Sequence, residues 1–426
     1  MAASLNPAEG ATSSRSARAI VVVGTLDTKR EELSYLKSQV ELRGREAILI
    51  DVSLKDNVGG ADISRDEVVK EAGIAAGSLK EVKEEWRAAE VMVRGLRRVL
   101  TRLYREDKIA GVVAVGGSMG TSMASAAMKA LPLGFPKLIV SAYASHNVRP
   151  YVGSKDITLM YSPMDFWGLN QYIKQLLSNA AAAICGMADA YEGSMGVPSR
   201  MFVAVTTKGA RAHVFAWRIR DLLAQRGLET VVFEAIGTGG EAYEDFVANQ
   251  PVLGCLDLAA AHEVVNYLCG AVHSAGPNRL KAAAEKGVAQ VVAPGSLDYL
   301  VFGPLDTLPK RYRRGRNVYV HNPVATLVRT EEREVVRTAR FMADRLNKAK
   351  GPVAVLIPLR GFSEFDKEGE VFYDPEVDLA FVNELKRRLE PKVRVVELDA
   401  HINDPGFAEE AVRLLEELVG EGLGPL

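Results

Sequence analysis

The sequence has little of several features that mark particular classes of protein. It contains only three cysteines and no C-x-x-C pair, so a disulfide framework and a zinc knuckle are both disfavoured. Its six histidines form no H-x-x-x-H pattern of zinc ligands. No apolar run is long enough to cross a membrane. The net charge of −1 gives no basic field for nucleic acid or an anionic membrane surface, so neither is expected as a partner.

Length and composition predict a soluble protein with two domains. A chain of 426 residues is too long for one ordinary core, and 48% of it is hydrophobic and 25% charged. Residues 1–18 are rich in Ala and Ser and lack the apolar core of a secretory signal, so we expect a disordered tail on a cytoplasmic protein. The predicted domains are residues 19–192 and 201–426, joined by a linker within residues 191–199 that contains Gly and Pro.

Strand and helix patterns alternate along both halves, which predicts an α/β fold with two Rossmann-like, doubly wound domains and mostly parallel sheets. In the first half, a buried strand from residue 19 runs into a polar loop, and a helix is expected over residues 30–43. Further helices are expected at 63–77, 79–106, 118–130 and 168–187, and strands at 47–53, 111–115, 137–142 and 156–162. In the second half, strands are expected near 202–207, 230–235, 254–258, 290–293, 317–320, 353–357 and 393–398, with helices in most of the gaps.

The stretch from Ala110 to Ala130 changes from a buried strand to a small-residue helix across Gly116 and Gly117. Glycine allows close approach of a ligand, Ser118 is expected to cap the helix, and the first-turn N–H groups then suit a phosphate. Neither G-x-G-x-x-G nor G-x-x-x-x-G-K-[ST] is present. Three interpretations stay open: an ordinary strand–helix turn, a nucleotide site, or a G-x-S-x-G elbow that presents Ser118 as the nucleophile of a serine hydrolase.

Ligands of open parallel sheets bind beyond the carboxyl ends of the strands, and polar residues collect there in both halves. Hydroxyls, a lysine, a carboxylate and glycine N–H groups together suit a phosphorylated ligand with a divalent metal. The predicted nucleotide-binding residues of the first half are Thr25, Asp27, Thr28, Lys29, Gly116, Gly117, Ser118, Gly120 and Thr121, with Asp27 also orienting Mg²⁺. The second half offers residues 237–240, Asp257, 294–298, 321–323 and 359–366, among which His321 and Asp298 are the candidate catalytic bases.

Several longer segments can be recognised as a set: GTLDTKREE, GGSMGTSM, PYVGSKDITLMYS, PGSLDY, HNPVATLVRT and FYDPEVD. They resemble the largely uncharacterised family that includes the N-terminal ATP-binding domain of the tomato mosaic virus resistance protein, from about Ile20 to the C-terminus. The resemblance implies two Rossmann-like subdomains, ATP bound by the first through the G-T-x-D-T-K segment and the glycine loop, and a homodimer. The chain departs from the family pattern at Arg30, at Met119 and in residues 257–263, where Asp-Leu-Ala-Ala-Ala-His-Glu replaces a D-L-T-T-T-E pattern.

The leading hypothesis is an ATP-binding protein of unknown biological activity, with N–H groups of Gly117 to Thr121 on phosphate and Lys29 supporting them. It extends to an ATP-dependent transferase or ligase acting on a small molecule in the cleft between the domains, with His321 or Asp298 as base. One alternative is a serine hydrolase that uses Ser118 with a later acid and His401. Another is a non-catalytic interaction protein regulated by ATP.

Overall fold

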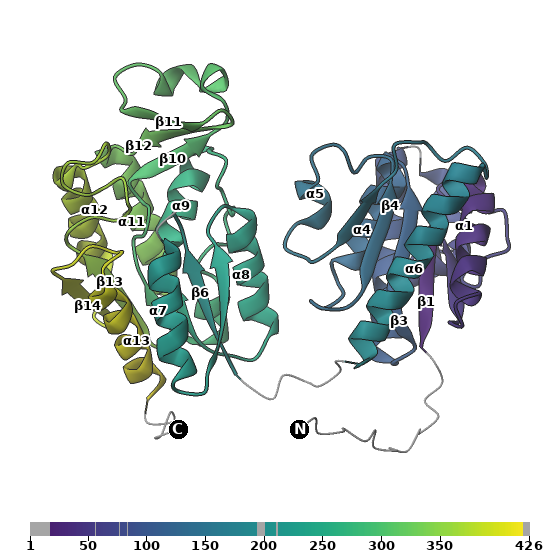
Figure 1. Ribbon diagram of the computed structural model, residues 1–426, viewed down its shortest axis with the longest axis horizontal. Coiled ribbons are helices and arrows are strands. Elements are labelled where there is room, and N and C mark those ends of the chain that lie inside the picture. Colours follow the sequence, from purple (N-terminus) through teal and green to yellow (C-terminus); the bar gives the residue numbers. More distant parts are fainter. Residues whose placement is uncertain are drawn as a thin grey trace, which may run out of the picture. The chain divides into compact units, whose positions relative to one another are not determined.

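The computed structural model describes residues 18–55, 57–75, 77–82, 84–193, 201–209 and 212–420. The chain divides into two compact units, residues 1–195 and 196–426 (Figure 1). In the described ranges, no helix combines the length and the apolar character that a membrane span requires. The predicted tail lies outside these ranges except for Arg18, which is buried and pairs with Asp107 at 2.8 Å. Most of the predicted linker, residues 194–199, also lies outside them.

The first unit has a parallel sheet of five strands in the order β2-β1-β3-β4-β5. The short apolar runs at β1, β3 and β4 are buried on both faces, as parallel strands covered by helices require. Helices α1 and α6 pack on one face, and α2, α3 and α4 pack on the other; α1, α4 and α6 are labelled in Figure 1. The strands are β1 Ala19–Gly24, β2 Ala47–Asp51, β3 Ile109–Gly116, β4 Lys137–Ser141 and β5 Thr158–Tyr161. The helices are α1 Leu26–Glu41, α2 Arg65–Glu71, α3 Glu85–Arg105, α4 Ser118–Met128, α5 Arg149–Val152 and α6 Gln171–Gly193, with a 3₁₀ turn at Ser78–Glu81.

The second unit has a parallel sheet of six strands in the order β7-β6-β8-β9-β13-β14. If the strands of this sheet are numbered by their order along the chain, the sheet order is 2-1-3-4-5-6, which is the order 2-1-3-4-5 of the first unit with one strand added. The prediction of an α/β fold with two mostly parallel sheets is therefore confirmed. The strands are β6 Phe202–Thr207, β7 Glu229–Glu234, β8 Val252–Asp257, β9 Ala289–Val292, β13 Val353–Pro358 and β14 Val393–Leu398. The helices are α7 Ala212–Ala224, α8 Thr238–Asn249, α9 Ala260–Cys269, α10 Ala282–Lys286, α11 Glu332–Leu346, α12 Pro375–Arg388 and α13 Pro405–Val419.

Between β9 and β13 the chain forms an antiparallel sheet that the sequence patterns did not predict as a sheet. Its strands are β10 Tyr299–Phe302, β11 Val318–Asn322 and β12 Ala325–Arg329, in the order β10-β12-β11, and short 3₁₀ turns at Leu305–Thr307 and Lys310–Tyr312 join the first two. Residues of β10 and β12 pack into the core that α9, α11 and α12 share. The prediction that His321 follows a strand was wrong, because β11 continues through His321 to Asn322.

Helix α1 starts at Leu26, four residues before the predicted start at Arg30. The early start depends on residues at the end of β2, since the backbone N–H of Leu26 donates to Asp51 Oδ1 at 3.1 Å and that of Asp27 donates to Ser53 Oγ at 3.0 Å. Side chains at the end of β2 thus satisfy the first amides of the helix. Residues 27–29 therefore lie in the first turn of α1 and not in a loop. The predicted helices 63–77 and 79–106 were too long, and that at 168–187 began too early and ended too soon.

Candidate functional site

The strand order of the first unit places its two predicted binding segments side by side. The chain crosses to opposite faces of the sheet after β1 and after β3, which are neighbours, so their following segments diverge and leave a crevice at the carboxyl edge. Thr25 to Lys29 follows β1, and Gly116 to Thr121 follows β3. The register confirms that both segments leave the same edge, since Val23 pairs with Ala114, one residue before the end of β1 and two residues before the end of β3.

The glycine turn has no room for a side chain at its first position. A Cβ atom at Gly116 would lie 2.7 Å from the backbone N of Thr121, so the turn closes tightly only with glycine there. Gly117 is the N-cap of α4, and a Cβ atom on it would meet no atom within 4 Å. The prediction that Ser118 caps the helix was wrong, because Ser118 is the first helical residue.

The first turn of α4 keeps unpaired backbone donors. The amide of Thr121 donates to Gly117 O at 3.0 Å, as an ordinary helical bond. In the described part of the chain, no side chain accepts from the amides of Ser118, Met119 or Gly120. Three N–H groups at the positive end of the helix dipole therefore face outward, which is the arrangement that binds phosphate oxygens.

Thr121 differs from the other predicted binding residues. Its side chain is fully buried, and its hydroxyl shares a 2.7 Å hydrogen bond with Ser141 Oγ at the end of β4. Its amide is also used within the helix. Thr121 therefore supports the turn from inside and has no group left for a ligand.

The segment after β1 contributes hydroxyls and charge. The hydroxyls of Thr25 and Thr28 lie 2.7 Å apart, and Thr28 is exposed. Lys29 interrupts the helical geometry of α1 with φ −137°. Amide and indole donors from Phe166 and Trp167, together with the positive charge of Lys29, lower the pKa of Asp165. The loop after β5 thus lies beside Lys29, a neighbour that sequence reasoning missed.

The geometry does not support the hydrolase hypothesis. A nucleophile elbow holds its serine in a strained turn, whereas Ser118 adopts helical geometry and is not among the described non-glycine residues with positive φ. His401 belongs to the second unit, where its Nε2 lies 2.9 Å from Ser363 O and its Nδ1 accepts from the amide of Asn403 at 3.1 Å. Both ring nitrogens are engaged, so His401 is not available as a base.

The glycine-rich turn of the second unit is already filled by a side chain. Glu263 Oε1 accepts from the amides of Gly237 at 2.7 Å and Gly240 at 2.9 Å, at the start of α8. Glu263 is itself buried and bonded to the buried guanidinium of Arg279 at 2.6 Å. An internal carboxylate thus takes the place that an anionic ligand would need.

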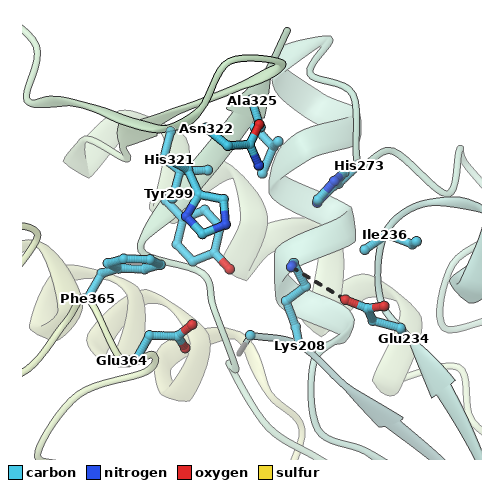
Figure 2. A pocket seen from close by; sticks show the side chains of 13 residues that line it. Lys208, Glu234, Ile236, His273, Tyr299, His321, Asn322, Ala325, Glu364 and Phe365 are labelled. Carbon is cyan, nitrogen blue, oxygen red and sulfur yellow. Dashed lines mark ion pairs between the residues drawn. The ribbon is translucent and has the colours of Figure 1, made fainter. Parts of the chain in front are cut away.

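The second unit has a pocket of about 380 Å³ at the carboxyl ends of β6 and β7, and the antiparallel sheet contributes much of its wall. It lies next to the point where β6 and β8 send their connections to opposite faces, which is the equivalent of the β1–β3 crevice. Figure 2 shows the polar side chains that converge on it. They include Lys208, Glu234, His273, Tyr299, His321 and Glu364.

Lys208 is the buried cation of this pocket. Its side chain is 13% exposed, and its Nζ lies 3.9 Å from Glu234 Oε1 (Figure 2). Burial lowers the pKa of Lys208, against the opposing effect of the charges on Glu234, Glu364 and Glu263. Glu364 lies against Gly209, where a Cβ atom would come within 2.3 Å of its Oε2. The absence of a side chain at Gly209, where φ is +106°, therefore lets the carboxylate of Glu364 approach the backbone next to Lys208 at the end of β6.

The opposite wall is aromatic. Phe365 contacts the rings of Tyr299 and His321 edge-on, at centroid distances of 5.7 and 6.2 Å. His273 also lines the pocket. Its Nδ1 lies 3.0 Å from Nε2 of the buried His262. His262 Nδ1 in turn lies 2.8 Å from Ser296 O. Burial and the neighbouring His273 lower the pKa of His262, so that ring is neutral.

Of the two predicted catalytic bases, His321 lines the pocket and Asp298 does not. Asp298 is fully buried, and its Oδ2 accepts from Ser363 Oγ at 2.6 Å. Burial, together with the charge of Asp366, raises the pKa of Asp298 to about 8. It lies in a buried cluster with Asp366, Asp378 and Arg329.

The comparisons with known proteins identify the family. The N-terminal domain of the uncharacterised protein family UPF0261 matches residues 18–193, and its C-terminal domain matches residues 200–419. The chain belongs to UPF0261. This confirms the resemblance found in the sequence motifs.

Members of UPF0261 match along nearly the whole chain. A UPF0261 protein of Clostridium tetani (strain Massachusetts / E88) is 42% identical over 91% of this chain and 96% of its own length. One from Rhizobium meliloti (strain 1021) is 37% identical over 94% and 98%. The ToMV resistance protein Tm-1(GCR237) of Solanum lycopersicum is 34% identical over 94% of this chain, which spans only 56% of the tomato protein.

Among solved structures, UDP-N-acetylglucosamine 2-epimerase from Rickettsia bellii gives a weak match. It is 9% identical, with a TM-score of 0.22, and the match covers 65% of this chain and 78% of the epimerase.

Proposed function

We propose that the first unit of this UPF0261 protein binds ATP, with its phosphates in the crevice between the ends of β1 and β3. The observation that carries this proposal is the set of outward-facing amides at Ser118, Met119 and Gly120, which no described side chain accepts from. The second unit provides a contrast within the same chain, because there the glycine-rich turn at the start of α8 is filled by Glu263. The resemblance of the GTLDTK and GGSMGT segments to an ATP-binding domain gives independent support.

The surrounding residues take complementary roles in this proposal. Phosphate oxygens accept from the three amides of α4, and the exposed hydroxyls of Thr25 and Thr28 donate from the other side of the crevice. Lys29 adds a positive charge. Among the described residues no group of three His, Cys, Asp or Glu side chains is placed to hold a metal ion. Asp27 therefore takes part in holding Mg²⁺ only together with the phosphates themselves, as is usual for this ion.

The test is calorimetric titration of Mg-ATP into the wild-type chain and into Gly117→Val. The backbone at Gly117, with φ −76° and ψ −153°, is open to other residues, and a Cβ there meets no protein atom within 4 Å. The valine thus places its methyl groups at the mouth of the helix without disturbing the fold. We expect affinity to fall by about tenfold or more, which corresponds to about 1.4 kcal/mol. Unchanged affinity in Gly117→Val would contradict the proposal.

A matched control is Gly186→Ala on the exposed side of α6, where a Cβ also meets nothing within 4 Å. Its affinity for ATP should equal that of the wild type. Phosphate release measured in the same samples separates two versions of the proposed function. Turnover would support a transferase or ligase, and binding without turnover would support regulation by ATP.

A further inference from the structure

The pocket of the second unit holds chemistry that ATP binding in the first unit does not use. We propose that this pocket binds a small hydroxylated aldehyde or ketone, and that Lys208 Nζ condenses with its carbonyl carbon to form an imine. The inference is independent of the nucleotide proposal, because it rests on different residues in a different unit.

Lys208 is placed to act as a nucleophile. It directly follows β6, at the edge of the sheet where ligands of such folds bind, and its side chain is 13% exposed. Within the described ranges its Nζ makes no hydrogen bond, and the single ion pair, to Glu234, is long at 3.9 Å. A salt bridge formed for stability alone is expected at hydrogen-bond distance. The loosely held amine therefore remains available to a ligand.

Desolvation favours the form of the amine that reacts. Burial lowers the pKa of Lys208, which increases the fraction of neutral amine near pH 7. Lysines in apolar, partly closed surroundings are the usual amines of imine-forming sites for this reason.

The charge balance of the pocket indicates the class of ligand. Glu234 and Glu364 flank the lysine, so carboxylates outnumber lysine and arginine side chains among the described residues that line the pocket (Figure 2). An anionic ligand would meet net repulsion there, whereas the protonated imine, a fixed cation, would be stabilised. The hydroxyl of Tyr299, the imidazole of His321 and the amide of Asn322 provide partners for the hydroxyl groups of a neutral ligand. A volume of about 380 Å³ suits a small molecule.

The proposed step balances without any further reagent. Glu234 first accepts a proton from the ammonium of Lys208. The neutral amine then attacks the carbonyl carbon, the C–N bond forms, and the electron pair of the C=O bond moves to oxygen, which takes up one of the two protons left on nitrogen and becomes a hydroxyl group. Glu234 returns its proton to this hydroxyl, the C–O bond breaks as the lone pair of nitrogen forms the C=N bond, and the hydroxyl leaves as water. The products are the protonated imine on Lys208 and one molecule of water.

The experiment uses the full chain, without ATP, at neutral pH. It is incubated with glyceraldehyde and sodium cyanoborohydride, which reduces an imine to a stable amine, and each lysine is then followed by peptide mass mapping over time. Lys392 serves as internal reference, because its side chain is 52% exposed on the surface. We expect Lys208 to be labelled well before Lys392. Labelling of Lys208 at the same rate as Lys392, or slower, would overturn the proposal.

Two further arms separate the parts of the inference. Glu234→Gln removes the proposed proton carrier and should slow labelling at Lys208 by about a hundredfold while leaving Lys392 unchanged. An unchanged rate at Lys208 would contradict the role of Glu234. Pyruvate replaces glyceraldehyde as an anionic probe, and preferential labelling of Lys208 by pyruvate would overturn the assignment of a neutral ligand. Failure of ATP to bind leaves all of these outcomes unaffected.

Discussion

Replacing Arg279 by methionine tests a buried charge cluster of the second unit. The fully buried guanidinium bonds to Asp257 at 2.6 and 2.7 Å, to Glu263 at 2.6 Å and to Glu244 at 3.0 Å. Without it, three buried carboxylates lose their common cation. Removing one partner of a buried ion pair costs about 3–5 kcal/mol, so we expect Arg279→Met to destabilise this unit by that amount at pH 7.

The effect should depend on pH in a defined direction. Burial already raises the pKa of Glu244 and Glu263, and loss of Arg279 removes the charge that opposes this. The folded variant therefore holds protons that the unfolded chain releases, so its stability rises as the pH falls from 7 to 5. The deficit relative to wild type should shrink over the same range.

Native-state hydrogen exchange of peptides from β8 and α9 measures the free energy of opening of the second unit separately from that of the first unit. Arg360→Met is the control, because Arg360 makes a similar two-point ion pair with Asp399 but both side chains are exposed, and no measurable loss is expected. A loss below about 1 kcal/mol in Arg279→Met, or a deficit that grows as the pH falls, would refute the reasoning.

Three other variants test the packing and a buried acid. Gly95→Ala should destabilise the first unit by about 1–3 kcal/mol, because a Cβ there would lie 1.9 Å from Val68 O at the contact of α2 with α3. Gly186→Ala on α6 should instead stabilise the unit by about 0.5–1 kcal/mol, because a Cβ there meets no atom within 4 Å. Hydrogen exchange of α3 and α6 peptides measures both changes, and equal effects would contradict the close approach at Gly95. Asp298→Asn should flatten the pH dependence of the second unit. The pKa of Asp298, raised to about 8, lies above its unfolded value, so its contribution is fully present below about pH 4 and is lost as the pH rises towards 8. Urea unfolding between pH 5 and 8 measures this slope, and an equal slope in the variant would count against a protonated Asp298.

Much of the first unit could be predicted from its sequence because its strands are short apolar runs bounded by glycine or polar residues. Such runs identify a buried parallel strand whatever packs on it. The start of α1 could not be predicted, because it depends on Asp51 and Ser53, which come 25 and 26 residues after the amides that they accept from. The same holds for Thr121, whose hydroxyl was predicted to bind the ligand but bonds to Ser141, 20 residues further along the chain.

The pocket of the second unit shows a different limit. His321 and the loop of residues 359–366 were selected from sequence, yet Lys208, Glu234, His273 and Tyr299 were not. The Thr-Thr-Lys-Gly segment that ends β6 was a usable signal, because it mirrors the Asp-Thr-Lys segment after β1. That these side chains meet in one pocket could not be predicted from the sequence, because the pocket requires the antiparallel sheet between β9 and β13 to fold over the edge of the parallel sheet. The burial of Asp298 away from the pocket could not be predicted from its position after a strand, because residues as distant in sequence as Arg329 and Ser363 bond to it.

Hydrogen–deuterium exchange of the full chain with and without Mg-ATP tests the central claim most directly, because the claim concerns particular backbone amides. We expect ATP to slow exchange in peptides that cover residues 117–120 and 25–29. Residues 237–240, whose amides Glu263 already holds, should not change. Unchanged exchange at residues 117–120 under saturating ATP, or protection at 237–240 in their place, would contradict the account.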